Sequence, residues 1–251
     1  MRSIILLLIA LGLPGHAQEL TVGAAADLRP ALEEIAAHFQ STSSVKLHPI
    51  YASSGDLYQQ IENGAPFDVF LSANVAYPLK LEQEQLTVSG TYFEYAQGKI
   101  VLMVRSASSL DISSGLSALL KPEIKKIAVA EPAHAPYGAA AVEALKTEKL
   151  YEQVTPKLVM GENISQTASF VLSGAADAGI VALSLVIAPP ANSQVRYVEI
   201  PAADYTPILQ ACVVLHSSKN KSAAAKFEDY LRGEEAATIL RRFGFEIPKA
   251  H

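Results

Sequence analysis

Thr21-Val22-Gly23-Ala24-Ala25-Ala26-Asp27-Leu28-Arg29-Pro30 is the stretch around which this chain is organised. An apolar strand runs into small residues and then into a helix, with Asp27 as the expected N-cap. Small side chains let a ligand approach the backbone, and the first N–H groups of a helix are unpaired donors at the positive end of its dipole. By itself the pattern is typical of an ordinary capped junction, so further evidence for an anion site must come from elsewhere in the chain.

The same arrangement occurs again further along the chain. Val45 to Tyr51 alternates apolar and polar residues as a strand does, and it leads through Ala52-Ser53-Ser54-Gly55-Asp56-Leu57 into another helix start. Parallel strands joined by right-handed crossovers place such helix N-termini at one edge of a sheet, where doubly wound folds bind ligands. The two helix starts therefore predict a ligand site at that edge.

Strands and helices alternate along the rest of the chain, which indicates an α/β protein with parallel pairing. Helical spacing predicts a helix over 28–39, followed by a loop over 41–44, and a second helix that stops at Asn63-Gly64, with Gly64 in the left-handed region. Further strands are expected at 67–73, 99–105, 126–130, 157–160, 178–182 and 212–215, and closing helices at 222–232 and 234–242. The second series of strands is long enough to form a core of its own.

Two cores predict two lobes. We assign residues 18–101 and 209–251 to lobe I, which is discontinuous, and residues 102–208 to lobe II. The closing helices cover lobe I in this assignment. The chain then crosses between the lobes twice, and these two crossings form a hinge.

Composition excludes several classes of function. The chain has 20 basic and 25 acidic residues and no run of Lys or Arg, so nucleic acid is not an expected partner. No G-x-S-x-G, Walker or H-E-x-x-H motif and no Cys/His cluster is present, which disfavours an enzyme or a metal-ion site. The single cysteine, Cys212, lies in an apolar run and is expected to be a buried hydrophobe that forms no internal disulfide.

Residues 1–17 have the features of a secretory signal peptide. Arg2 gives a positive start, Ile4 to Leu13 is an apolar run, and Gly15-His16-Ala17 offers small residues at the cleavage positions. The apolar run is about half the length of a membrane-spanning helix, and no cysteine lies near the cleavage point. We therefore expect a periplasmic protein that begins near Gln18 and carries no lipid anchor.

The second lobe has two helix starts of its own. Glu131-Pro132-Ala133-His134-Ala135-Pro136-Tyr137-Gly138 should direct the N–H groups of Tyr137 and Gly138 outwards. Gly161-Glu162-Asn163-Ile164-Ser165 is the other start, and on local grounds it is typical of a surface turn capped by Asn163 or Ser165. His134 is expected to stabilise its turn, because no partner for acid–base chemistry accompanies it.

Several motifs, taken in order, resemble the periplasmic molybdate-binding proteins of ABC transporters, and they cover nearly the whole mature chain. They are Ala24-Ala25-Ala26-Asp27-Leu28, Ala52-Ser53-Ser54-Gly55, residues 63–73, Pro132-Ala133-His134-Ala135-Pro136-Tyr137-Gly138, Gly179-Ile180-Val181 and Arg242-Phe243-Gly244-Phe245. The resemblance implies a two-lobed type II periplasmic binding protein fold, each lobe a mixed, mostly parallel sheet flanked by helices, with the ligand in the cleft. It also implies capture of molybdate, and of tungstate, for an inner-membrane ABC permease by a monomer without cofactor or catalysis.

The resemblance also assigns ligand contacts. Ser54 matches a ligand hydroxyl, Tyr137 and Ile164 match backbone donors, and Asp27 stands where the family usually has a serine. No metal ion is implied beyond the molybdenum inside the anion, which these four residues would contact through its oxygens. Ala182 replaces the tyrosine that the family usually has at its position.

Three alternatives remain open at this point. The ligand is another oxyanion, with Asp27 accepting a proton that the ligand carries, or the chain is a transferase on the same fold, or it is the sensing domain of a regulator. A carboxylate beside a dianion requires an explanation in the leading hypothesis. We expect Asp27 to cap its own helix through Arg29 or Ala31, and the other possibility is that Asp27 is protonated when the ligand is bound.

Overall fold

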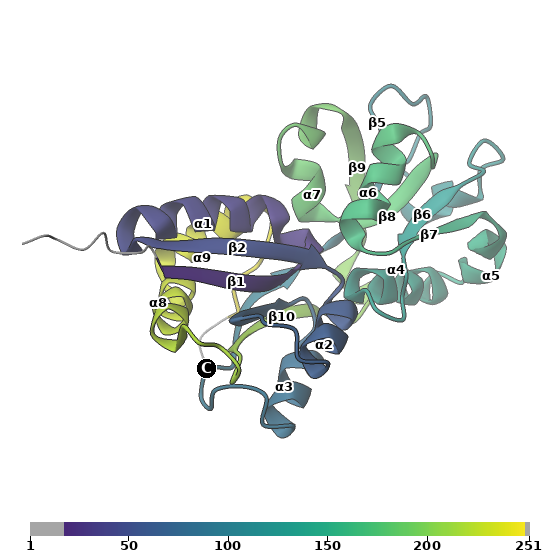
Figure 1. The fold of residues 1–251 in the computed structure, drawn as a ribbon. Coiled ribbons are helices and arrows are strands. Elements are labelled where there is room, and N and C mark those ends of the chain that lie inside the picture. The colour runs from purple at the N-terminus through teal and green to yellow at the C-terminus, as the bar shows by residue number, and fades with distance from the viewer. Residues whose placement is uncertain (1–17, 249–251) are drawn as a thin grey trace, which may run out of the picture.

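The computed structural model describes residues 18–248, and the expected signal peptide at 1–17 lies outside them. The chain forms two lobes (Figure 1), and each lobe is built on a sheet that has five strands. The first sheet has the order β2 (Val45–Ala52), β1 (Gln18–Ala25), β3 (Val69–Ser72), β10 (Ile208–Val214) and β4 (Phe93–Gly98). The second has the order β7 (Leu158–Gly161), β6 (Ile127–Ala130), β8 (Ala178–Ala182), β5 (Ile100–Arg105) and β9 (Val195–Glu199).

Helices cover both faces of the first sheet. Successive side chains of β3 point to opposite faces: Leu71 joins the core beneath one group of helices, and Phe70 joins the core beneath the other. The first group is α1 (Arg29–Ser43), α8 (Lys221–Arg232) and α9 (Glu234–Arg242), and the second is α2 (Ser54–Glu62) and α3 (Ala76–Gln83). The closing helices α8 and α9 therefore pack on the first lobe, as expected.

The second lobe has one continuous core around β5, β6 and β8, all of whose residues except Arg105 are buried. Its helices are α4 (Pro136–Thr147), α5 (Tyr151–Val154), α6 (Ile164–Ser173) and α7 (Leu183–Ile187). Short 3₁₀ turns connect several elements, and η1 (Ala26–Leu28), between β1 and α1, is the one that matters for the site.

The sheets are mixed, as expected, but they are less parallel than the alternation of strands and helices predicts. Two of the four pairings in each sheet are antiparallel, because β10 returns between β3 and β4 and β5 lies between β8 and β9. The expected strands all form, with ends that differ from the expected ones by at most four residues. Two strands, β4 and β9, were missed, and both lie at a sheet edge where one side is exposed and the apolar pattern is weak.

The helix predicted over 28–39 is longer than expected. It continues to Ser43, and the loop predicted over 41–44 is wrong except for Ser44, which ends the helix at a φ of 58°. The hydroxyls of Ser41, Thr42 and Ser43 donate to carbonyls three or four residues earlier, so this polar run satisfies itself within the helix. Gly64 has a φ of 83°, which confirms its predicted left-handed conformation at the end of α2.

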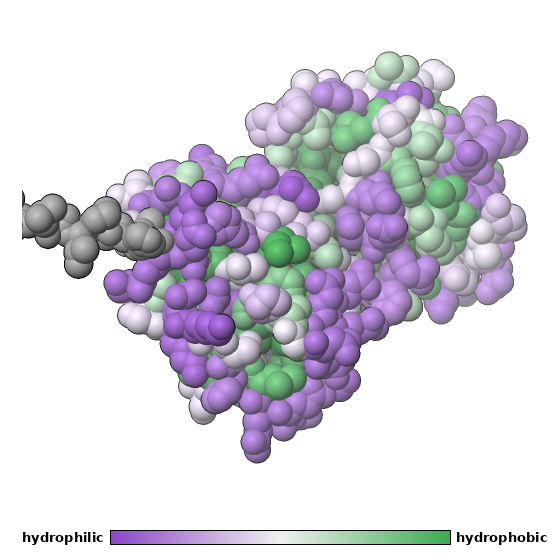
Figure 2. Space-filling model, viewed as in Figure 1, coloured by the Kyte–Doolittle hydropathy of each residue, from purple (hydrophilic) through white to green (hydrophobic). Residues whose placement is uncertain are grey.

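The chain passes between the sheets at Lys99 and again in the segment between β9 and β10. The change of sheet falls slightly earlier than the predicted lobe boundaries, since Ile100 and Val101 belong to β5 and Ile208 belongs to β10. Hydrophilic residues cover most of the face in Figure 2, and apolar residues form small separate areas on both lobes. Between residues 18 and 248 no helix has both the length and the apolar character needed to cross a bilayer.

Candidate functional site

A small cavity lies where the two lobes meet, at the C-terminal ends of five strands. Its volume is about 10 Å³, room for about one water molecule. The lining residues follow β1, β2 and β3 in the first lobe and β6 and β7 in the second: Ala25, Ala26, Asp27, Ala52, Ser53, Ser54, Ala73, Ala135, Pro136, Tyr137 and Ile164. All four site residues predicted from the sequence, Asp27, Ser54, Tyr137 and Ile164, are among them. Adjacent parallel strands β2, β1 and β3 place their ends at one edge, which is the physical basis of the prediction.

The first turn of α2 leaves one backbone donor for the cavity. The N–H of Gly55 donates to the carbonyl of His134 (2.9 Å), and the N–H of Asp56 donates to Oγ of Ser53 (3.2 Å), which caps the helix. The N–H of Leu57 returns to the Ser53 carbonyl. The unused donor of this turn is therefore the N–H of Ser54, the first residue of the helix.

The first turns of α4 and α6 follow the same rule. In α4, Pro136 has no N–H and Gly138 donates to the carbonyl of Ala135, which leaves Tyr137 as the unused donor. Gly138 was also expected to point its N–H outwards, and this is wrong. In α6, Oδ1 of Asn163 accepts from the next two N–H groups after Ile164, at 3.0 Å each, so the N–H of Ile164 remains. Asn163 is thus the cap, as one of the two sequence alternatives proposed.

The hydroxyl of Ser54 is oriented by the backbone of the first lobe. Its Oγ accepts from the N–H of Ala73 (2.9 Å), and the side chain is fully buried. A hydroxyl has one proton to donate in addition to its acceptor lone pairs. Because the Ala73 contact uses the acceptor side, the proton of Ser54 is available to a ligand in the cavity.

Asp27 does not cap its helix, so the capping prediction is wrong. Neither η1 nor α1 has a side-chain cap, and Oδ2 of Asp27 instead accepts from the Tyr137 hydroxyl (2.8 Å) and from Nε2 of Gln210 (2.6 Å). The side chain is completely buried, and Oδ1 has no hydrogen-bond partner among the described residues. Burial raises the pKa of Asp27 to about 6, against the opposing effect of the hydrogen bonds from Gln210 and Tyr137 and of the backbone N–H groups of Asp27 and Leu28.

Gln210 and Tyr95 complete this network, and neither was predicted from the sequence. Gln210 lies on β10, its Nε2 also donates to the Tyr137 oxygen (3.0 Å), and its Oε1 accepts from the Tyr95 hydroxyl (2.9 Å). A fully buried glutamine in an otherwise apolar strand was the available signal. Burial and the nearby Asp27 carboxyl raise the pKa values of Tyr95 and Tyr137 far above the usual value, so both hydroxyls stay protonated donors.

Hydrogen bonds join the two lobes around the cavity. Besides the contact between Gly55 and His134, the hydroxyl of Ser165 on α6 donates to the Ala26 carbonyl (2.9 Å), and that of Ser184 on α7 donates to the Asp27 carbonyl (2.8 Å). His134 thus contributes its carbonyl to closure. Closure excludes water from the site and strengthens each hydrogen bond inside it.

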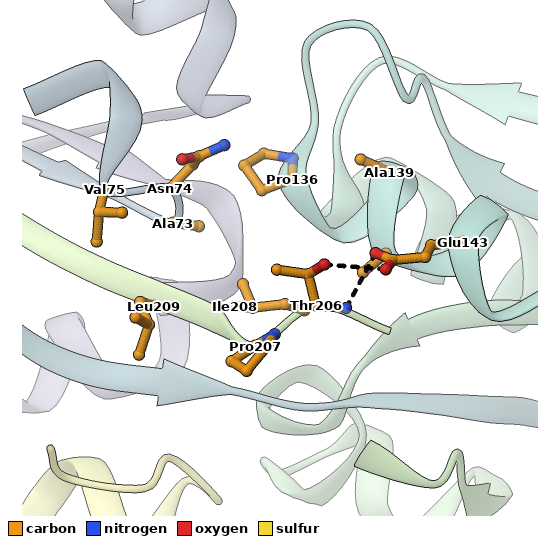
Figure 3. A pocket seen from close by; sticks show the side chains of 11 residues that line it. Ala73, Asn74, Val75, Pro136, Ala139, Glu143, Thr206, Pro207, Ile208 and Leu209 are labelled. Carbon is orange, nitrogen blue, oxygen red and sulfur yellow. Dashed lines mark hydrogen bonds between the residues drawn. The ribbon is translucent and has the colours of Figure 1, made fainter. Parts of the chain in front are cut away.

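A second, larger pocket lies beside the hinge and has a different character (Figure 3). It is lined mainly by apolar residues and by Asn74, Glu143 and Thr206. Both oxygens of Glu143 are occupied, one by the Thr206 hydroxyl and one by its N–H, at 2.9 Å each. This pocket presents a carboxylate and no group of converging donors, so it does not suit an anion.

The small cavity suits an anion that needs no cation. None of its lining residues is Lys, Arg or His. Within residues 18–248 no group of three or more His, Cys, Asp or Glu side chains is placed to hold a metal ion. Ala182 is buried at the end of β8 and is not a lining residue, so its position contributes no hydroxyl. Cys212 is fully buried, which confirms its prediction as a core hydrophobe.

Two lobes closing over a small cavity lined by hydrogen-bond donors define a solute-binding protein. In agreement, the family described as bacterial extracellular solute-binding protein matches residues 20–246. The molybdate-binding protein ModA of Rhodobacter capsulatus is 37% identical over 239 residues, covering 95% of this chain and 92% of that protein. The chain belongs to the family of molybdate-binding ModA proteins. This is a family of binding proteins, in agreement with the expectation that the chain is not an enzyme.

Solved structures support the same assignment. The periplasmic molybdate-binding protein of Azotobacter vinelandii superposes with a TM-score of 0.86 at 32% identity, covering 92% of this chain and all of that one. The sulfate-binding protein SubI of Mycobacterium tuberculosis superposes with a TM-score of 0.76, covering 92% of this chain and 88% of that one. At 16% identity the second likeness concerns the fold alone. Together they confirm the expected two-lobed binding-protein fold.

Proposed function

We propose that this protein captures molybdate, and also tungstate, in the cavity between the lobes and delivers it to an ABC permease of the inner membrane. One observation carries the proposal: three helices, α2, α4 and α6, each leave one N–H unused, and the three residues that own them line one cation-free cavity. The names of the relatives add the identity of the anion. We also propose that residues 1–17 are removed on export, so that the mature periplasmic protein begins near Gln18.

Neutral donors are the appropriate chemistry for this ligand. A fully deprotonated tetrahedral oxyanion accepts hydrogen bonds at every oxygen, so N–H groups and the Ser54 hydroxyl can hold it without a formal positive charge. Hydrogen phosphate carries a proton and needs an acceptor in the site.

Asp27 is the one lining residue that conflicts with a dianion when it is ionised. A unit negative charge at 4 Å from a dianion costs about 8 kcal/mol at an effective dielectric of 20, which is twice the value for two unit charges. No cationic side chain lines the cavity to offset this. The protonation of Asp27 is therefore the central question of the site.

A thermal-shift experiment tests the proposed function. Ligand that binds only the folded state at a hundredfold excess over Kd stabilises it by about 2.7 kcal/mol, or about 5 to 10 °C in Tm for a chain of this size. We expect this shift with molybdate and with tungstate, and a much smaller one with sulfate or phosphate at the same concentration. A shift with phosphate and none with molybdate would contradict the proposal.

Ser54→Ala tests the assigned hydroxyl. One hydrogen bond to a charged group is worth roughly 1.5 to 3 kcal/mol, so Kd for molybdate should rise about ten- to hundredfold in isothermal titration calorimetry. Ser169→Ala is the matched control, because that serine lies exposed on α6. An unchanged Kd in Ser54→Ala, with both variants folded, would exclude Ser54 as a ligand contact.

A further inference from the structure

We propose that Asp27 binds the oxyanion as a neutral carboxylic acid that donates its Oδ1–H to the ligand, so that each dianion is captured together with one proton. This inference rests on the proposed function and names a specificity-determining residue within that site. The proton comes from solvent when the lobes close and returns to solvent when the ligand is released. No bond other than the carboxyl O–H forms or breaks.

The hydrogen-bond network determines which oxygen carries the proton. Asp27 Oδ2 accepts from both Tyr137 and Gln210, so it is the acceptor oxygen of the carboxyl group. Gln210 donates to Asp27 through Nε2, while its Oε1 accepts from the Tyr95 hydroxyl. Oδ1 is buried and accepts no hydrogen bond from the side chains or backbone of residues 18–248 that meets distance and angle criteria, and Asp27 lines the cavity. A proton on Oδ1 turns this unpaired atom into a donor, and an oxyanion supplies the acceptor that it lacks.

Burial favours the neutral form of Asp27, against the hydrogen bonds from Gln210, Tyr137 and the backbone N–H groups of Asp27 and Leu28, which favour the carboxylate. The titratable and polar groups on the elements packed against it are Tyr95 on β4, Tyr137 on α4, Gln210 and Cys212 on β10, Ser165 on α6 and Ser184 on α7. None of them is a cation. The nearest basic residue in sequence, Arg29, has its guanidinium carbon 4.1 Å from the centre of the Tyr51 ring. Burial raises the pKa of Asp27 to about 6, so a proton is available near neutral pH once a dianion disfavours the carboxylate.

The sign of the pH dependence follows from this pKa. Above a pKa of about 6 the free protein has an ionised Asp27 that must take up a proton on binding. Kd should therefore rise about fiftyfold between pH 6 and pH 8, and it should approach tenfold per pH unit at the upper end. In Asp27→Asn the amide is neutral at every pH, so Kd should be flat across the same range.

Isothermal titration calorimetry of the mature protein with molybdate measures the proton directly. Titrations at pH 6, 7 and 8, each in two phosphate-free buffers of different ionisation enthalpy, give the number of protons bound per ligand. We expect close to one proton at pH 8 in the wild type and none in Asp27→Asn, and the variant should bind at least as tightly as the wild type at pH 8. A flat Kd and no proton uptake in the wild type would overturn the inference while leaving the proposed function in place.

Phosphate binding distinguishes an Asp27 that donates a proton from one that accepts it. Phosphate binding that is present in the wild type and lost in Asp27→Asn would show that Asp27 accepts a proton from the ligand, and this overturns the inference. Failure of both proteins to bind molybdate or tungstate at any pH would overturn the proposed function together with it.

Tyr137→Phe provides a second test in a protein that retains Asp27. The Tyr137 hydroxyl lowers the pKa of Asp27, so its removal should move the rise in Kd to higher pH. Tyr58→Phe is the matched control, because it removes a hydroxyl that contacts Glu62 and Glu84 and not Asp27. If Asp27 has a purely structural role, the pH at which Kd rises should be the same in both variants as in the wild type. That result would contradict the inference.

Discussion

Replacing Gly55 by alanine is expected to weaken molybdate binding about a hundredfold without destabilising the ligand-free protein. An added Cβ at this position would lie 2.8 Å from the carbonyl oxygen of His134 and 2.9 Å from its Cα. Those atoms belong to the opposite lobe, and they are backbone atoms that cannot rotate away. The Tyr77 hydroxyl, on α3 of the same lobe, also lies 2.9 Å from the added Cβ, but it is the end of a side chain that can move. The backbone clash therefore exists only when the lobes are closed, and closure is the state that binds the ligand.

The magnitude follows from two contributions. Overpacking against a rigid neighbour costs about 1 to 3 kcal/mol, and the hydrogen bond from the Gly55 N–H to His134 contributes about 1 kcal/mol more. A total of about 3 kcal/mol corresponds to about a hundredfold in Kd. In the open form the same substitution favours the helix, because alanine is better than glycine inside a helix by about 1 kcal/mol.

Two properties of Gly55→Ala are measured: its affinity for molybdate, which should fall, and its Tm without ligand, which should not fall. Calorimetry should show the loss of affinity, and thermal unfolding without ligand should show a Tm that is unchanged or higher. Gln60→Ala, at an exposed position of the same helix, should leave the affinity unchanged. A Gly55→Ala variant that binds molybdate normally would show that closure does not bring α2 against His134.

Asp27→Asn is expected to stabilise the ligand-free protein at pH 8 by about 3 kcal/mol relative to the wild type. The pKa of Asp27 is raised from 3.8 to about 6 by burial, and each pKa unit corresponds to 1.36 kcal/mol. Because the folded-state pKa is the higher one, the stability associated with the neutral carboxyl is complete below about pH 4. It is lost as the pH rises through 6.

The asparagine variant stays neutral, so it does not undergo this loss. Urea unfolding of both proteins at pH 4, 5, 6 and 8, without oxyanion, should give a difference in free energy of unfolding that is near zero at pH 4. The difference should then grow to its full value by pH 8. Glu152→Gln, an exposed carboxylate on α5, is the matched control and should show no comparable trend. A difference that is the same at pH 4 and pH 8 would contradict the raised pKa and leave only a packing effect.

Most of the fold was predictable from the sequence because its strands are buried on both faces. Runs such as Ile127–Ala130 are apolar throughout and are bounded by turn residues, which is a strong local signal. The edge strands β4 and β9 carry polar residues on their exposed sides, so their pairing depends on a neighbour and not on their own pattern. Half of the strand pairs in each sheet are antiparallel, and this could not be predicted either. It depends on which strands β5 and β10 lie between.

The positions of the proposed binding donors were determined locally. Pro136 at the first position of α4 and Asn163 as the cap of α6 decide, within one helical turn each, which N–H is left unused. At the start of α2, the cap Ser53 likewise leaves the N–H of Ser54 unused. The resemblance to molybdate-binding proteins could therefore assign Ser54, Tyr137 and Ile164 from the sequence, and the structure places all three at one cavity.

The chemistry of Asp27 was decided by the tertiary structure alone. Local sequence predicts a helix cap, but the carboxyl group is bound instead by Tyr137 from the other lobe and by Gln210 from β10, 110 and 183 residues away along the chain. Burial by both lobes, and not any neighbour in sequence, raises its pKa. The sequence by itself thus determined the elements and the donors, because these depend on a few adjacent residues. Only the folding of distant segments against one another decided which oxygen of Asp27 is left for a proton and a ligand, because desolvation and hydrogen bonding depend on everything that packs around a group.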